Sequence, residues 1–450
     1  MTLPQHWRLG SVAELIEGID SGKNLRCEER PPASEEVGIV KISAVTWGAF
    51  DATKSKTVAS GTQLPDSTRI RTGDLLISRA NTLELVGATV LVQEAPANLH
   101  LSDKVLRLRA KPGWEKWLNI FLNSVDGRSE IESRATGNQL SMRNIGQDAI
   151  RNIALPIPPL AEQRRIVARI EALFARTRRA RANLERIAPL STRYAEQSRR
   201  RAFDEDASWP TSIPDRALPS YIPPARFDEL RRVPQGWRWA EMSAIASVAG
   251  GITKNPKRSG QPLEMPYLRV ANVYADDLRL ADVSTIPVTR AELDRVLLQS
   301  GDLLIVEGNG SVEQIGRVAV WDGSIPSCGH QNHLIRVRPV HGVRPRFLLH
   351  WLMSPYGRSI LETVASSSSG LHTLSLSKIA AVPVPLASTA VADIVVTALD
   401  HAIGSVRAMQ VDIVRALTLV DRLEQSILAR AFRGKLVPQE AGHSSVEKAA

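Results

Sequence analysis

The chain repeats its own sequence pattern after about half its length, and this duplication constrains the fold more than any other feature. Four short anchors recur in the same order, three of them at offsets of 227 to 229 residues. Such a period lies far above the roughly 20–50 residues of solenoid repeats. The anchors are Pro4-Gln5-His6-Trp7 with Pro234-Gln235-Gly236-Trp237, Gly73-Asp74-Leu75-Leu76-Ile77 with Gly301-Asp302-Leu303-Leu304-Ile305, Leu155-Pro156-Ile157-Pro158 with Val382-Pro383-Val384-Pro385, and Ala202-Phe203 with Ala431-Phe432. The sequence therefore predicts one unit, a globular domain followed by a long helix, present twice.

The sequence of each copy predicts a β-rich globular part of about 150 residues, which is long enough to bury its own core. Short apolar runs bounded by turn residues recur at matching places, as in Val37 to Ile42 and Pro266 to Val270. A short apolar helix and then a polar loop follow in both copies. The expected boundaries are 1–158 for the first globular domain, 159–203 for the first long helix, 204–232 for a proline-rich linker, 233–385 for the second globular domain, 386–432 for the second long helix and 433–450 for a C-terminal tail.

The two long helices carry apolar seams that predict a coiled coil. In the second helix one row repeats every seven residues, and a second row accompanies it; the first helix has a similar seam, which Pro189 should kink. Two apolar seams in one chain can pack against each other. We therefore expect an α+β fold in which two β-rich domains are joined by an antiparallel intramolecular coiled coil, duplicated with pseudo-two-fold symmetry. The seam residues are Leu399, Val406, Ile413, Val420 and Ile427, then Val395, Ala402, Met409, Ala416 and Leu423, and in the first helix Ile166, Ile170, Leu173, Ala180, Leu184 and Ile187.

The amino-acid composition indicates the cellular compartment and the class of partner. Cys27 and Cys328 lie in opposite halves without a CxxC motif, which argues against a disulfide framework or a cysteine zinc site and favours the cytoplasm. We expect no bound metal, no signal peptide and no membrane span. A net charge of +10 favours a polyanionic partner, and arginines crowd the first long helix.

The run from Leu155 to Ile166, with Pro-Pro-Leu-Ala-Glu-Gln-Arg at its centre, resembles the signature that follows a target recognition domain in the specificity subunit of type I restriction–modification systems. The Gly73 to Ile77 motif and the run from Ala431 to Leu436 resemble the same family, as does the order of domains and helices. The resemblance covers essentially the whole chain. The second copy departs from it, because Pro385-Leu386-Ala387-Ser388-Thr389-Ala390 replaces the Pro-Leu-Ala-Glu-Gln-Arg stretch.

The resemblance implies a non-catalytic subunit that reads a bipartite, gapped DNA target, one half with each recognition domain. Two methyltransferase subunits would modify adenine N6, and restriction–translocase subunits would cut unmodified DNA. S-adenosylmethionine, ATP and Mg²⁺ are expected on those partners, and no cofactor on this chain. The sequence agrees, since it contains neither the Asn/Asp-Pro-Pro-Tyr/Phe motif that holds a flipped adenine nor a Walker A loop. The resemblance also implies partner contacts at the start of the first helix, at Glu162, Gln163, Arg164 and Arg165.

Three polar loops that differ between the copies are the candidate DNA readers, because base-edge contacts specify sequence while phosphate contacts position the protein. Gln331, Asn332 and His333 are weaker candidates, since Asn332 and His333 can simply cap a strand end. Each loop can also be an ordinary solvated surface. The candidates are Lys23, Asn24 and Arg26 with Lys254, Asn255, Lys257 and Arg258; Arg79 and Asn81 with Glu307, Asn309, Ser311 and Gln314; and Asn138, Gln139, Ser141 and Arg143 with His372 and Thr373.

Two other functions remain open. A coiled-coil scaffold with protein-binding globular ends would account for the helices and treat the basic charge as incidental. An autonomous restriction enzyme would need the catalytic motifs that this sequence lacks. Salt dependence separates the first alternative from a DNA reader, because counterion release makes DNA affinity fall steeply as salt rises.

Overall fold

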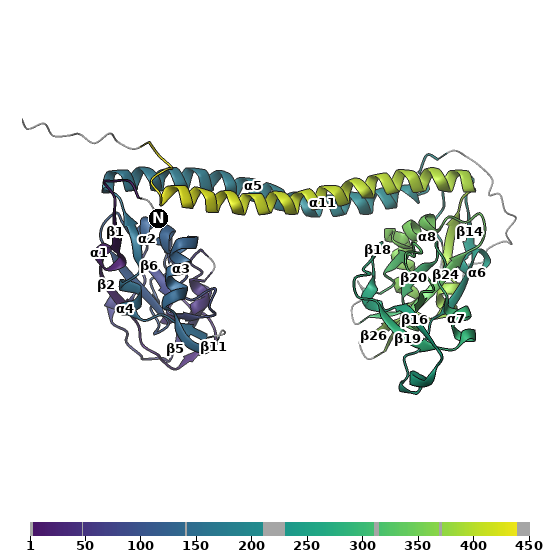
Figure 1. Cartoon of the computed structure of the whole chain (residues 1–450), viewed down its shortest axis with the longest axis horizontal. Helices are drawn as coiled ribbons and strands as arrows, with labels where there is room; N and C mark the ends of the chain where they lie inside the picture. The colour runs from purple at the N-terminus through teal and green to yellow at the C-terminus, as the bar shows by residue number, and fades with distance from the viewer. Residues whose placement is uncertain are drawn as a thin grey trace, which may run out of the picture. The chain divides into compact units, whose positions relative to one another are not determined.

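The computed structural model divides into two compact units. Unit 1 comprises residues 1–184 and 415–450, and unit 2 comprises 185–414. The two 43-residue helices, α5 (Leu160–Ala202) and α11 (Thr389–Ala431), each begin in one unit and end in the other (Figure 1). The residues described are 3–46, 48–139, 142–209, 230–309, 315–368 and 371–438. Most of the predicted proline-rich linker and the end of the C-terminal tail therefore lie outside the described residues.

A four-stranded antiparallel sheet of order β2-β10-β6-β8 forms the centre of unit 1. A second sheet, β3-β5-β4-β9, and a short sheet, β11-β12-β7, accompany it, while β1 pairs with β13 beside the start of α5. The strands are β1 Arg8–Ser11, β2 Ile16–Ser21, β3 Cys27–Glu28, β4 Gly38–Val40, β5 Ser55–Val58, β6 Leu75–Ser78, β7 Ala80–Asn81, β8 Thr89–Leu91, β9 Leu99–His100, β10 Val105–Ala110, β11 Thr136–Gln139, β12 Met142–Asn144 and β13 Ala154–Ile157; the helices are α1 Val12–Leu15, η1 Ile42–Ala44, η2 Asp66–Thr68, α2 Glu115–Leu122, α3 Val125–Arg134 and α4 Gln147–Arg151.

Unit 2 repeats this topology, with a central antiparallel sheet of order β15-β24-β20-β22. The sheets β19-β16-β23 and β21-β26-β25, the pair β17-β18 and the pair β14-β27 complete it. The strands are β14 Arg238–Glu241, β15 Ala246–Gly250, β16 Leu263–Leu268, β17 Val273–Tyr274, β18 Asp277–Leu278, β19 Ser284–Val288, β20 Leu303–Val306, β21 Gly308–Asn309, β22 Val318–Val320, β23 Gly329–His330, β24 Leu334–Pro339, β25 Ser366–Ser368, β26 Leu371–Thr373 and β27 Pro383–Leu386; the helices are α6 Met242–Ile245, η3 Pro256–Gly260, η4 Val270–Asn272, α7 Arg290–Val296, α8 Pro345–Leu352, α9 Pro355–Val364 and α10 Leu376–Ala380.

The repeated Ala-Phe anchor closes the core of the unit in which each long helix ends. Phe432 lies edge-on to Trp117 and Phe121 in unit 1, with ring centroids 4.9 and 5.1 Å apart. Phe203 makes the same kind of contact with Phe347 and Trp351 in unit 2, at 5.3 and 5.4 Å. Since buried edge-to-face aromatic pairs stabilise beyond their buried area, each helix end is fixed in the unit opposite to the one in which the helix begins.

Within each unit α5 and α11 run in opposite directions, as predicted. Thr177 of α5 donates to Glu424 of α11 in unit 1, and the next turn pairs Arg181 with Asp421. In unit 2, Gln410 Nε2 donates to Ser191 Oγ at 3.4 Å. The helix α5 continues through Pro189. These contacts confirm the fold class: two β-rich regions joined by long helices that pack together.

The seam prediction holds for one row of α11 and is partly wrong for the other residues. Leu399, Val406, Ile413 and Ile427 are buried and Val420 of the same row is half-buried, whereas Met409 and Leu423 of the second row are 46% and 52% exposed. On α5 the seam is buried at its start but exposed at Ala180 and Ile187. Near the start of α11, burial follows the face turned to the core of unit 2 rather than a strict heptad. Ile403, which the heptad omitted, is buried for this reason.

Among the described residues, α11 alone is long and apolar enough to cross a membrane by length and composition. A core helix passes the same test, and the apolar side chains of α11 enter the core of unit 2 at its start and the core of unit 1 at its end.

Candidate nucleic-acid interface

The three candidate loops of unit 1 meet at one end of the central sheet. Lys23 forms a β-bridge with Ser102, which comes just before β10. The backbone N–H of Arg79 donates to the carbonyl of Lys104 at 2.8 Å, and the N–H of Ile145 donates to the carbonyl of Arg79 at 2.9 Å. Segments separated by up to about 120 residues in sequence are thus fixed side by side by backbone hydrogen bonds. We call this end of unit 1, and the corresponding end of unit 2, the loop end.

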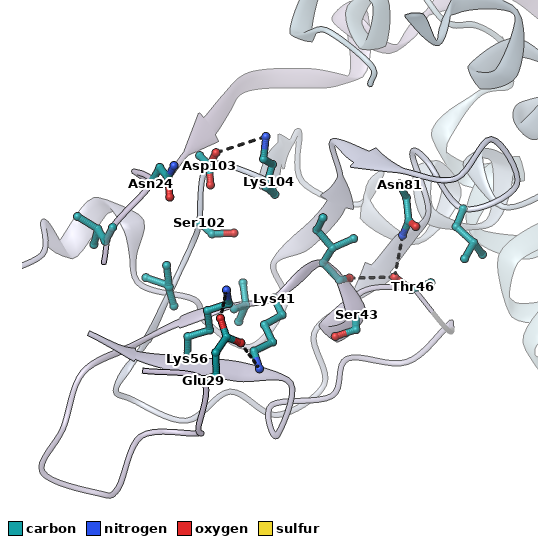
Figure 2. A pocket seen from close by; sticks show the side chains of 15 residues that line it. Asn24, Glu29, Lys41, Ser43, Thr46, Lys56, Asn81, Ser102, Asp103 and Lys104 are labelled. Atoms are coloured by element: carbon teal, nitrogen blue, oxygen red, sulfur yellow. Dashed lines mark hydrogen bonds and ion pairs between the residues drawn. The ribbon is translucent and has the colours of Figure 1, made fainter. Parts of the chain in front are cut away.

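A cavity of about 610 Å³ opens at the loop end and joins the first two loops (Figure 2). Asn24 of the first loop and Asn81 of the second line it together. The Nδ2 of Asn81 donates to Thr46 Oγ1 at 3.4 Å, and its Oδ1 accepts from the backbone N–H of Thr82. The hydroxyl of Ser102, which also lines the cavity, is buried without a hydrogen-bond partner among the described residues. The cavity therefore presents amide and hydroxyl groups of the kind that read base edges.

Sequence reasoning missed the lysines of this cavity. Lys41 and Lys56 hold Glu29 between them, with N···O distances of 3.0 and 2.5 Å, while Lys104 lies 3.6 Å from Asp103. Hydrogen bonds from Lys56 and Lys41 lower the pKa of Glu29 below its ordinary value. These lysines lie between the candidate loops in sequence, so only the folded sheet brings them to the cavity. No motif in the sequence marks them.

The third loop of unit 1 is a hairpin rather than an irregular loop. Its strands β11 and β12 pair with each other, and β12 pairs with β7, so that Arg143 lies opposite Asn81 in register. The Nη1 of Arg143 donates to the carbonyl of Gly137 at 2.6 Å and holds the hairpin closed. Asn138 and Gln139 lie on β11, and Ser141 lies outside the described residues.

Several cations of the loop ends are exposed and unpaired. Within the described parts of the chain, Lys23, Arg26 and Arg79 have no ion pair, and neither have Lys254 and Lys257 of unit 2. Arg258 differs, because its guanidinium binds both oxygens of Glu292 at 2.9 and 3.0 Å. This hydrogen bonding lowers the pKa of Glu292 to about 2. Arg258 thus fixes η3 against α7, and the unpaired lysines are the groups free to meet phosphate.

The first loops of the two units differ in where their Lys-Asn pair lies, Lys23-Asn24 in unit 1 and Lys254-Asn255 in unit 2. The residue bridged to the segment before β24 is Ile252, which pairs with Gln331 as Lys23 pairs with Ser102. Lys254 and Asn255 therefore lie two residues further along the loop than Lys23 and Asn24. Asn255 accepts from the backbone N–H of Lys257 at 3.0 Å and caps η3, a task that Asn24 does not have.

The second and third loops of unit 2 also meet in one sheet. Asn309 of β21 lies opposite His372 of β26, and Gly308 lies opposite Thr373. The side chain of Glu307, just before β21, interacts with His333 Nδ1 at 3.1 Å. Ser311 and Gln314 lie outside the described residues.

The four candidate partner residues at the start of α5 divide into two buried and two exposed. Glu162 is 4% exposed, and its Oε2 binds His6 Nε2 at 2.7 Å and Trp7 Nε1 at 3.0 Å. Gln163 is 1% exposed. Arg164 and Arg165 are exposed, and Arg165 also donates to the carbonyl of Pro438 at 3.5 Å. A partner subunit would therefore meet the arginines, while Glu162 fixes the N-terminal segment to the helix.

Most of the net positive charge of the chain lies on α5. The helix holds twelve arginines, no lysine and four glutamates, whereas α11 holds four arginines and five acidic residues. Arg169, Arg176 and Arg179 are exposed and have no ion pair within the described residues. Among the described residues, no group of three His, Cys, Asp or Glu side chains could hold a metal ion.

Comparisons with known proteins agree with this architecture. No protein-family model matches the chain. Over 448 residues the chain is 25% identical to the specificity subunit of the type I restriction enzyme EcoKI from Escherichia coli K12, covering 97% of this chain and 90% of that protein. It is 24% identical over 443 residues to the StySPI specificity subunit from Salmonella potsdam, with coverage of 97% and 90%.

Two solved structures share the fold. The crystal structure of the HsdS subunit from Thermoanaerobacter tengcongensis gives a TM-score of 0.57 at 21% identity, covering 97% of this chain and 99% of that one. A chain from a structural study of the assembly and conformational transition of the type I restriction–modification system gives 0.69 at 20% identity, covering 97% and 100%.

Proposed function

We propose that this chain, which belongs to the specificity subunits of type I restriction enzymes, reads a bipartite DNA target, with one half-site at the loop end of each unit. The observation that carries the proposal is the convergence of three separate polar loops at the loop end of unit 1, where the first two share a cavity that presents amide, hydroxyl and ammonium groups together. Unit 2 builds the corresponding end from different side chains, as two unlike half-sites require.

The residues divide by task. Exposed cations without acidic partners, such as Lys23, Arg26 and Lys254, contact phosphates and set the register of the protein on the duplex. Asn24 and Asn81 contact base edges from the cavity, with Arg79 beside them and the β11–β12 hairpin carrying Asn138, Gln139 and Arg143. In unit 2 the same tasks fall to Lys257, Glu307, Asn309, Ser311, Gln314, His372 and Thr373.

The chain acts within a type I restriction–modification complex. We infer that two methyltransferase subunits bind it and transfer a methyl group to adenine N6, while restriction–translocase subunits complete the assembly. S-adenosylmethionine, ATP and Mg²⁺ would be held by those subunits. The exposed arginines of α5, beginning with Arg164 and Arg165, form the contact surface for such partners, because arginine is enriched at protein interfaces. Because such a complex acts on chromosomal DNA, we infer that this chain is located in the cytoplasm.

Unit 1 supplies a matched pair of variants for the phosphate contacts. Lys23 forms a β-bridge with Ser102 at the loop end, three residues before β10, and Lys111 immediately follows β10 at the other end, where its backbone N–H binds the carbonyl of Leu15. The strand β10 between them spans about 20 Å. Both side chains lie on unit 1, so their variants differ chiefly in position.

The test measures DNA affinity of the complex with its methyltransferase subunits as a function of salt. We expect Lys23→Ala to weaken binding and to reduce the slope of log K against log salt by about one, because one phosphate contact is lost. Lys111→Ala should leave both unchanged. Equal effects of the two variants, or binding insensitive to salt, would refute the proposed interface and favour a protein-binding scaffold.

A further inference from the structure

Residues 79 and 307 occupy equivalent positions in the two units, fixed by the same backbone hydrogen bonds. The N–H of Arg79 donates to the carbonyl of Lys104, and the N–H of Glu307 donates to that of His333, at 2.8 and 3.0 Å. The carbonyl of Arg79 accepts from Ile145, and that of Glu307 accepts from Leu374. Each of these two residues therefore leaves its sheet at the same point and beside the same partner strand.

The side chains at these matched positions are opposite in chemistry. In unit 1, Arg79 and Lys104 are both cations and offer only hydrogen-bond donors. In unit 2, Glu307 offers a carboxylate, which His333 Nδ1 orients from 3.1 Å. The Glu307 side chain is 32% exposed and that of His333 57%, so the pair remains accessible from solvent.

The positions are also next to the candidate readers already described. Arg79 directly precedes β7, in which Asn81 lines the cavity, and Glu307 directly precedes β21 with Asn309. Asparagine is thus shared by the two units two residues further on, while the preceding position inverts from cation to anion. A shared asparagine close to a residue whose charge is opposite in the two units is the pattern expected where two half-sites differ in one base.

We propose that the pairs Arg79–Lys104 and Glu307–His333 determine which base each unit accepts at one position of its half-site; the inference rests on the proposed function. Guanine presents two acceptors, N7 and O6, in the major groove, and the donor-only pair of unit 1 selects it. Cytosine presents the N4 amino group, a donor, and the carboxylate of Glu307 selects it. The half-site read by unit 1 therefore contains a guanine where the half-site read by unit 2 contains a cytosine.

The test exchanges the pairs in the full chain, expressed with its methyltransferase subunits, and measures methylation of duplexes in which each half-site position carries each of the four bases. In the double variant Arg79→Glu with Lys104→His, the preference for guanine at one position should fall about ten- to a hundredfold. Cytosine should gain at that position only, and the other half-site should be unchanged. The reciprocal variant, Glu307→Arg with His333→Lys, should convert cytosine to guanine in the other half.

A conservative variant keeps the test decisive if an exchange reduces overall activity. Glu307→Gln preserves the size of the side chain but replaces the charged acceptor with an amide, which pairs with adenine. We expect it to move the preference from cytosine towards adenine. An unchanged base preference in all variants, or an equal loss for all sequences, would overturn the inference. In that case, if the unaltered chain still directs methylation to a gapped two-part motif, the proposed function stands and only the base assignment is refuted. If the unaltered chain directs methylation to no gapped motif, both the proposed function and the base assignment are refuted.

Discussion

Replacing Glu162 with valine should loosen the start of α5 without unfolding unit 1, because the second copy already contains this arrangement. The strand register β1-β13 and β14-β27 aligns residues 157 and 386, so that Glu162 corresponds to Val391, the third residue of α11. Val391 is 2% exposed, and the indole N–H of Trp237 is buried there without a partner among the described residues. In unit 1 the corresponding indole, on Trp7, donates to Glu162.

The size of the effect follows from the groups left behind. The variant removes one acceptor from the buried indole N–H of Trp7, which costs about 1–3 kcal/mol, and one hydrogen bond to His6, whose side chain is 41% exposed and contributes less. Against this, Oε1 of Glu162 is itself buried without a hydrogen bond among the described residues, and the variant removes that penalty. We expect a net loss of about 2 kcal/mol in local stability.

Hydrogen exchange of the full chain measures this locally, which matters because two units need not unfold together. Exchange in the segments around Trp7 and at the start of α5 should become about thirtyfold faster in Glu162→Val, as about 2 kcal/mol implies. Arg164→Ala, on the exposed face of the same turn, should not change exchange but should weaken binding of a methyltransferase subunit. Unchanged exchange in Glu162→Val, with partner binding lost, would show that Glu162 is a partner contact and that the reasoning is wrong.

Two further predictions concern the supports of the loop ends. Arg107 is 6% exposed, and its guanidinium binds Asp20 at 2.7 Å, Asp74 at 3.0 Å and the carbonyl of Arg69, so Arg107→Ala should lower the free energy of unfolding by about 3–5 kcal/mol in thermal unfolding. Arg109 lies half-exposed on the same strand, and Arg109→Ala should lower it by less than about 1 kcal/mol. Similar losses for the two variants would contradict this account. The pKa of Glu292 lies near 2, below its ordinary 4.5, because of Arg258, so the η3–α7 contact should be fully stable above pH 4.5 and weaken as pH falls towards 2. In Arg258→Ala a carboxyl titration of Glu292 by NMR should return towards 4.5; a pKa that stays near 2 would exclude Arg258 as the cause.

The duplication and the helices could be predicted because they leave regular marks on the sequence. The Gly-Asp-Leu-Leu-Ile motif leads into a buried strand in both units, and the short apolar helix predicted in each copy is present and carries Trp117 in unit 1 and Phe347 in unit 2. The Ala-Phe repeat was visible, but its purpose was not, because Phe432 meets Trp117 only once a helix crosses into the other unit. The helices α3 and α9 were missed, although Ser124 and Ser354 cap them; α3 in particular lacks a long apolar stripe.

The candidate site could be predicted in part. Loops rich in polar residues can be recognised in the sequence. Backbone hydrogen bonds join the three loops of unit 1, as a DNA reader would need. Lys41, Lys56 and Ser102 could not be found, since nothing in their local sequence distinguishes them from other strand-flanking residues. The third anchor is also shifted between the copies: Leu155-Pro156-Ile157-Pro158 matches Val382-Pro383-Val384-Pro385 in letters, but in the strands Ile157 corresponds to Leu386. A repeated dipeptide cannot reveal such a two-residue shift.

The central claim is that the two units read two halves of one DNA target, and a methylome tests it most directly. The chain is expressed with its methyltransferase subunits in a host that lacks the system, and N6-methyladenine is mapped across the genome. We predict a gapped, two-part motif that disappears when this chain is omitted and changes in one half only when Arg79 and Lys104 are exchanged for Glu and His. Methylation at an uninterrupted motif, or methylation that persists without this chain, would contradict the account.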